Sequence, residues 1–199
     1  IGYISLGSLS DTVKAVSVDG VAATAENVAN GTYPIARPFN VAVKEGLSDV
    51  AADFLTFLTS AEGQQIIEDE GYIKAVTDAP AYTGSGMSGT VSLAGSTSVG
   101  PVMEVLAEAY MEINPDVSVE VQQSGSGAGM TSAIEGVCDI GMASRDVSEE
   151  EQAQGLIPTT IATDGIAVIV NLENPVDNMA SEDIRDIYLG TITDWSEIQ

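Results

Sequence analysis

The second half of the chain alternates apolar β-type runs with amphipathic stretches, and this alternation restricts the fold more than any other feature. Four strand–helix pairs follow one another from residue 90: TVSLAG and PVMEVLAEAYMEI, VSVEVQQ and GMTSAIEGV, CDIGMAS and SEEEQAQG, GIAVIVN and SEDIRDIYLG. Consecutive pairs of this kind are typical of βαβ units, whose strands are parallel and whose helices cover the sheet. The sequence therefore predicts an α/β fold with a mostly parallel central sheet flanked by helices.

The first 75 residues contain a less regular set of elements. Two short strands, a short helix capped by Thr24 and a further strand are expected at residues 1–6, 13–18, 24–31 and 37–44. Apolar residues at helical spacing then predict two amphipathic helices between residues 48 and 72, with breaks at Gly63 and Gly71. Residues 76–89 lose this periodicity and gain Pro, Gly and Ser, which predicts a flexible linker.

Charge excludes several classes of partner. The chain carries 30 acidic and six basic residues and a net charge of -24, which repels nucleic acids and anionic membranes. Its longest apolar runs, such as GIAVIV, are far shorter than the ~20 residues that a membrane-spanning helix needs. We therefore expect no nucleic-acid partner and no membrane span in this chain.

Catalytic chemistry is also disfavoured by the residue types present. The chain has no His, so the commonest general base and metal ligand is absent. Cys138 lies in an apolar stretch and is expected to be a buried hydrophobic residue, and the three glutamates at 149–151 to form a solvated helix face. We expect no catalytic residue, no metal site, no cofactor and no enzymatic activity.

Two strand-to-helix turns share one composition. They are GSTSVGP at 95–101 and SGSGAGM at 124–130. Glycines let a backbone approach a ligand, hydroxyls donate hydrogen bonds, and helix starts present N–H groups with partial positive charge, so an oxyanion suits both turns. Neither turn matches a nucleotide-binding motif. The alternative is that Gly and Ser serve here only as turn formers and helix caps.

A third turn brings a cation into this acidic chain. The apolar stretch that begins at Cys138 ends in Ser144, Arg145 and Asp146. A guanidinium at the carboxyl end of a strand, near two anion-binding turns, is a candidate ligand clamp. The alternative is a salt bridge from Arg145 to Asp146 or to one of the glutamates at 149–151.

Several motifs carry a family resemblance. In the second half they are GSTSVGPVMEVLAEAYMEINPDVSVEVQQSGSGAGM, CDIGMASRDVSEEE, IATDGIAVIVNLENPV and IRDIYLGTITDWSEI. These resemble the amino-terminal half of the PstS-type phosphate-binding protein of the bacterial phosphate-specific ABC transporter. The motifs IGYISLGSL, VKAVSVDGVAATAENVANGTYPIARPF and FLTSAEGQQIIEDEGYI resemble the family's carboxyl-terminal end. The resemblance thus implies an inverted order with a missing middle segment, as in a piece cut across tandem copies or in a circular permutant.

The resemblance implies a domain arrangement. Family members belong to the periplasmic-binding-protein type II superfamily and are two-lobed clamps that hold phosphate between their lobes. The hinge strand and helices of the first lobe are then expected at 37–75 and its core at 90–171, with 76–89 as the linker. Residues 1–36 and 172–199 are expected to be stubs of a partial second lobe.

The resemblance also assigns site residues. Phosphate is expected to contact hydroxyl and backbone N–H groups of Thr97 and Ser98, and Ser126 at the second helix start. Gly125 and Gly127 are expected to let further N–H groups approach the anion.

The third turn completes this set, with Ser144 ligating an oxygen and Arg145 lending charge or bracing the site. Ser144 stands where some members carry an acid that accepts the phosphate proton and rejects sulfate, with Asp146 two residues further on, so that discrimination is in doubt. The second-lobe contacts have no counterpart in the chain, so half a site and weak phosphate binding are expected.

The function implied by the resemblance is extracytoplasmic capture of inorganic phosphate for uptake by an ABC transporter. The expected partners are phosphate and the permease subunits, and the expected location is the periplasm or, as a lipoprotein, the cell surface. Two alternatives stay open: a binder of another oxyanion such as sulfate or molybdate, and a surface interaction or sensor module with a vestigial pocket.

Overall fold

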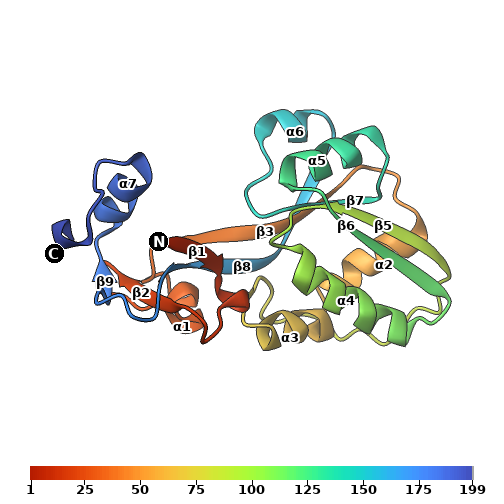
Figure 1. Cartoon of the computed structure of the whole chain (residues 1–199). Coiled ribbons are helices and arrows are strands. Elements are labelled where there is room, and N and C mark those ends of the chain that lie inside the picture. The colour runs from red at the N-terminus through yellow and green to blue at the C-terminus, as the bar shows by residue number, and fades with distance from the viewer. Residues whose placement is uncertain (199) are drawn as a thin grey trace. The chain divides into compact units, whose positions relative to one another are not determined.

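The computed structural model of the chain describes residues 1–198 and divides into two compact units (Figure 1). Unit 1 consists of Ile1–Arg37 and the residues from Asp164 onward, and unit 2 is Pro38–Thr163. Two strands, β3 (Ala36–Val43) and β8 (Ile157–Val170), contribute residues to both units.

Unit 2 is built on a mixed sheet with the strand order β6-β5-β7-β3-β8, with β4 also paired to β8. The remaining strands are β4 (Ile73–Lys74), β5 (Gly89–Gly95), β6 (Val117–Gln123) and β7 (Ile140–Ala143). β5 runs parallel to both β6 and β7, which confirms the βαβ arrangement predicted for residues 90–143. The fourth predicted strand, β8, does not continue the parallel series and pairs antiparallel with β4. β3 and β4, from the first part of the chain, pair antiparallel to β7 and β8 and make the sheet mixed.

Helices cover both faces of this sheet (Figure 1). They are α2 (Asp49–Leu58), α3 (Ala61–Asp69), α4 (Gly100–Ile113), α5 (Ser126–Glu135) and α6 (Glu149–Ala153). Because successive side chains of a strand point to opposite faces, Phe39, Val41 and Val43 of β3 pack with α2, α3 and α4, whereas Ala42 packs with Met130 and Ala133 of α5. The result is a three-layer lobe of helices, sheet and helix.

Three element boundaries differ from the sequence-based expectation. Gly63 is not a break: α3 begins at Ala61, where the Ser60 side chain caps the helix by accepting from the Gly63 N–H, at 3.2 Å. α5 begins at Ser126 rather than near Gly129. β8 starts at Ile157, eight residues before the expected strand, because its polar residues Thr160 and Asp164 are hydrogen-bonded rather than exposed in a loop.

Residues 76–88, within the expected linker, contain no helix or strand but are attached to the helices of unit 2. A single oxygen of Asp53 on α2 accepts hydrogen bonds from the hydroxyls of Tyr82, Ser85 and Tyr110, at 2.5, 2.6 and 2.6 Å. Tyr82 also packs edge-on against Phe57 of α2. The segment is therefore held to α2 and α4.

We expect an Asp53→Ala variant to release this segment. Burial raises the pKa of Asp53, but the three hydroxyl bonds outweigh it and the pKa lies below its ordinary value. The stabilisation from this carboxylate is therefore present above its unfolded pKa of about 3.9 and is lost as the pH falls. The variant should lose about 1–2 kcal/mol at neutral pH, the size of a partly screened charged hydrogen bond.

Hydrogen exchange provides the measurement. The backbone of residues 80–86 should exchange faster in Asp53→Ala at neutral pH, and the difference from the unmodified chain should shrink on acidification. Asp116→Asn, which changes an exposed carboxylate of the same unit, is the control. Equal exchange in both variants would contradict the proposed attachment.

Unit 1 is smaller and is organised around the second part of β8. β1 (Gly2–Ser5) and β2 (Lys14–Val18) both pair antiparallel with β8, and β9 (Asn178–Met179) pairs parallel with β2. Two helices, α1 (Ala25–Ala29) and α7 (Ser181–Leu189), and two short 3-10 helices, Leu6–Ser8 and Trp195–Glu197, complete it. No helix within residues 1–198 combines the length and the apolarity that crossing a bilayer requires.

Candidate functional site

The parallel strands β6, β5 and β7 end at one edge of the unit 2 sheet, and the three predicted turns meet there. The Gly95 carbonyl at the end of β5 accepts hydrogen bonds from the N–H groups of Ser124 and Gly125, both at 2.8 Å. On the other side of β5, the Ser96 N–H donates to the carbonyl of Met142 in β7, at 2.9 Å. The end of β5 is therefore hydrogen-bonded to the turn that follows β6 and to β7.

Two glycines make this close arrangement possible. Gly95 has φ +148°, and a Cβ there would lie 2.2 Å from the Met142 carbonyl oxygen. Gly129, in the second turn of α5, lies so close to β5 that a Cβ would be 2.4 Å from the Ala94 carbonyl oxygen and from the Gly95 Cα. The start of α5 is thereby fixed against the end of β5.

The turn after β5 is organised by Ser96, a residue that the sequence analysis missed. Ser96 is buried, and its Oγ accepts from the N–H groups of Ser98 and Val99, at 3.2 and 3.3 Å. Thr97 is exposed and Ser98 is half-buried. A serine in a strand-to-helix turn can accept hydrogen bonds from the backbone N–H groups two and three residues later, so this role could have been found.

The turn after β6 leads into α5 through Gly125, whose φ is +89°. The first N–H groups of a helix have no intrahelical partner and carry partial positive charge. A Cβ placed on Gly127, in the first turn of α5, would meet no heavy atom of another element within 4 Å, so the space beside this residue is open. These N–H groups are suited to an anion.

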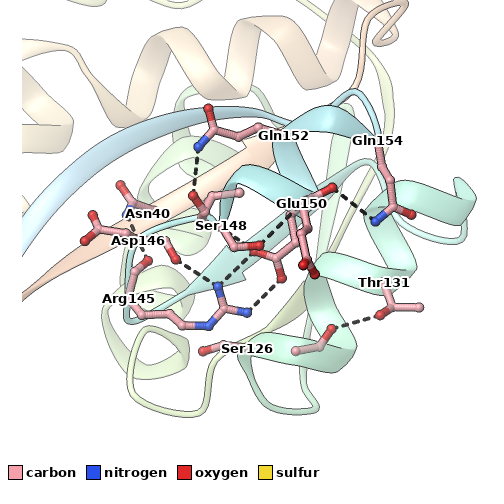
Figure 2. Close-up of polar contacts among 12 residues, drawn as sticks. Asn40, Ser126, Thr131, Arg145, Asp146, Ser148, Glu150, Gln152 and Gln154 are labelled. Atoms are coloured by element: carbon pink, nitrogen blue, oxygen red, sulfur yellow. Dashed lines mark hydrogen bonds and ion pairs between the residues drawn. The ribbon is translucent and has the colours of Figure 1, made fainter.

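The turn after β7 is tied to both helices that flank it, and Figure 2 shows the contacts of Arg145 with α6. The Ser144 N–H donates to Ser126 Oγ at 3.3 Å, so the predicted serines of the second and third turns are in contact. The Arg145 guanidinium forms a bidentate pair with Glu151 of α6, at 2.9 and 2.8 Å, and also donates to the Asp146 carbonyl at 2.8 Å. The salt-bridge alternative for Arg145 is the one that the structure shows.

The pairing has an electrostatic consequence. Hydrogen bonding to Arg145 is the main cause that lowers the pKa of Glu151 to about 2, and the same pair raises the pKa of Arg145. Glu151 also accepts from the Ser148 N–H at 2.8 Å in a capping box of α6. Arg145 is thus neutralised by an internal carboxylate and anchors its turn to α6.

The remaining chemistry-bearing residue, Cys138, is buried just before β7. Burial raises the pKa of its thiol, which disfavours the reactive thiolate. The interpretation of Cys138 as a buried hydrophobic residue is confirmed. Within residues 1–198, acidic and thiol side chains form no group of three or more that could hold a metal ion.

Open α/β sheets bind their ligands at the carboxyl ends of their strands, and the edge at which two helix starts and three hydroxyl-bearing turns converge is such a place. The sequence profile of the PBP superfamily domain matches residues 80–199. The phosphate-binding protein PstS 2 of Streptococcus agalactiae serotype V is 47% identical over 199 residues, which is 100% of this chain and 68% of that protein. The chain belongs to the PstS family of phosphate-binding proteins.

Solved structures agree with this assignment. A phosphate ABC transporter phosphate-binding protein from Streptococcus pneumoniae is 43% identical and superimposes with a TM-score of 0.88 over 100% of this chain and 77% of that chain. A protein from Clostridium perfringens, described as a phosphate ABC transporter substrate-binding protein with bound phosphate, is 54% identical, with a TM-score of 0.53 over 55% of this chain and 45% of that chain.

Proposed function

We propose that the chain binds inorganic phosphate as an extracytoplasmic solute-binding component of an ABC transporter. The observation that carries this proposal is the meeting of three turns and two helix starts at one sheet edge, joined through Gly95 and through the Ser144–Ser126 contact. The names of its relatives point to the same ligand. Binding and delivery to permease subunits require no bond to be made or broken.

The proposed ligands are neutral donors. The exposed Thr97 and the half-buried Ser98 and Ser126 carry the proposed hydroxyl donors, with the N–H group of Gly127 beside them. The N–H of Gly125 is not one of the proposed donors, because it already donates to the Gly95 carbonyl. Ser144 contributes a hydroxyl, whereas Arg145, being paired with Glu151, braces the turn rather than supplying a free charge. The net charge of -24 does not prevent this, because screening over ~8 Å confines its field while local dipoles act at contact distance.

We further propose that unit 2 supplies only one half of a clamp. The resemblance implies that β3 and β8 would cross between the two lobes, and unit 1 would then correspond to part of the second lobe. Since each charge-assisted hydrogen bond contributes about 1.5–3 kcal/mol, a site with donors from one lobe should hold phosphate weakly. Location in the periplasm or, as a lipoprotein, on the cell surface belongs to the same proposal.

A phosphate titration of the isotope-labelled chain, followed by NMR, tests the binding proposal. We expect amide shifts at millimolar phosphate to concentrate on Thr97, Ser98, Ser126, Gly127 and Ser144. Ser126→Ala should weaken binding by about tenfold, because it removes one hydroxyl and the acceptor of the Ser144 N–H, a loss of about 1.4 kcal/mol.

The control is Ser132→Ala, which changes a half-buried serine near the other end of α5. It should leave the titration unchanged. Shifts spread evenly over unit 2, or an unaltered response in Ser126→Ala, would contradict the proposed site.

A second ligand of the same class, sulfate or another oxyanion, is favoured by one observation. Ser144 is neutral, and a hydroxyl can donate as well as accept, so it does not repel a fully ionised anion as a carboxylate would. Repeating the titration with sulfate at neutral and acidic pH distinguishes a phosphate-specific site from a general oxyanion site. A site that depends on a protonated ligand binds phosphate alone, whereas a general site also responds to sulfate.

A further inference from the structure

Asn40 is a polar residue inside an otherwise apolar strand. It lies in β3, where Phe39, Val41 and Ala42 are fully buried, and is itself only 3% exposed. Asparagine is depleted in strands, and burying an amide without hydrogen bonds is costly. Its presence therefore needs a reason beyond packing.

Both ends of the Asn40 amide are hydrogen-bonded. Nδ2 donates to the carbonyl oxygen of Arg145 at 2.9 Å, and Oδ1 accepts from the hydroxyl of Thr160 in β8 at 2.7 Å. A carbonyl oxygen can only accept, so the NH2 group must face Arg145 and the amide oxygen must face Thr160. The amide orientation is thus fixed by its two partners.

The position of Asn40 in the sheet explains its reach. Asn40 lies opposite Ala143, the last residue of β7, in the antiparallel β3–β7 pair. Its side chain therefore extends past the end of β7 to the turn that carries Ser144 and Arg145, as Figure 2 shows. Thr160 of β8, Asn40 of β3 and Arg145 of the turn after β7 form a chain of hydrogen bonds.

We propose that Asn40, oriented by Thr160, is the positioning residue that holds the turn after β7 at the anion-binding edge. The turn is held at three points: by Ser126 through the Ser144 N–H, by Glu151 through the Arg145 side chain, and by Asn40 through the Arg145 carbonyl. Only the third contact comes from the buried interior of the sheet. This hydrogen bond fixes how far Ser144 lies from the carboxyl ends of the strands.

The part of this proposal that concerns the ligand rests on the proposed phosphate binding. The part that concerns the turn does not, because it is visible in the protein without ligand. One set of variants tests both parts.

The decisive variant is Asn40→Asp. It keeps the shape and the acceptor for Thr160 but places a carboxylate oxygen against the Arg145 carbonyl, so the turn should move away. We expect faster amide hydrogen exchange at Ser144 and about tenfold weaker phosphate binding, equivalent to about 1.4 kcal/mol. Thr160→Val, which removes only the orienting hydroxyl, should change both readouts in the same direction but less.

Asn114→Asp is the matched control. Asn114 is 1% exposed, and its Nδ2 donates to the Tyr82 hydroxyl and to the Tyr110 carbonyl, at 3.0 and 3.3 Å. It follows the C-terminal end of α4, whereas the anion-binding edge lies at the N-terminal end of that helix. It should lose stability as Asn40→Asp does, with phosphate binding and Ser144 exchange unchanged.

Each outcome decides the proposal. If both variants weaken phosphate binding in proportion to lost stability, or if Asn40→Asp binds phosphate normally, the positioning role is wrong. If the unmodified chain gives no response to phosphate, the proposed function fails. Hydrogen exchange at Ser144 then still tests the positioning role. Faster exchange in Asn40→Asp than in Asn114→Asp supports this role, and equal exchange in the two variants overturns it.

Discussion

Replacing Gly129 by alanine is expected to destabilise unit 2 by about 3 kcal/mol, the upper part of the range for overpacking a core. The added Cβ would lie 2.4 Å from the Ala94 carbonyl oxygen, 2.4 Å from the Gly95 Cα and 2.9 Å from the Ala94 carbonyl carbon. All three atoms belong to the backbone of β5, so no side-chain rotation can relieve the contact. The helix must move away from the strand, which also displaces the N–H groups at its start.

The matched control lies two residues earlier in the same helix. A Cβ on Gly127 meets nothing within 4 Å, and alanine is the better helix former by about 1 kcal/mol. Gly127→Ala should therefore be neutral or slightly stabilising in urea unfolding followed by circular dichroism. Equal shifts of the midpoint in both variants would show that the close approach of α5 to β5 does not limit stability.

Much of unit 2 was predictable because its signal is local. The period of the apolar residues gave β5, α4 and β6 at almost their observed bounds, and glycines and serines located the turns at the strand ends. The parallel pairing of β5 with β6 and β7 followed from the strand–helix alternation alone. These features depend only on neighbours in sequence.

The rest depends on contacts between distant residues, which a periodic pattern does not encode. Nothing near Asn40 in the sequence indicates that it binds the carbonyl of Arg145, 105 positions away. Nor does the pattern place β3 between β7 and β8 or show which glutamate pairs with Arg145. The sequence pattern places the turns correctly at strand ends, but the contacts that hold them together depend on the tertiary structure.

In unit 1, replacing Asp164 by asparagine is expected to cost about 3 kcal/mol, because breaking a buried ion pair from one side is strongly destabilising. Asp164 is fully buried. One of its oxygens accepts from Arg37 Nε and a terminal guanidinium nitrogen, at 3.1 and 3.0 Å, and the other accepts from Ser5 Oγ and the Leu6 N–H, at 2.7 and 3.3 Å. The asparagine amide has the same shape as the carboxylate, but its NH2 group must face donors, either those of Arg37 or those of Ser5 and Leu6. The substitution also removes the negative charge opposite Arg37.

The exposed pair in the same unit is the control for this result. Lys14 Nζ and Asp177 Oδ1 are 2.7 Å apart, but the Asp177 side chain is 86% exposed. Asp177→Asn should therefore lower the free energy of unfolding by no more than about 1 kcal/mol. Trp195 is the chain's single tryptophan and lies in unit 1, so its fluorescence during urea unfolding reports on the unit that both substitutions change. Equal losses of unfolding free energy in the two variants would contradict this prediction. They would mean that the four donors around Asp164 accept a neutral amide, and that the charge of Asp164 is not what holds β1, β3 and β8 together.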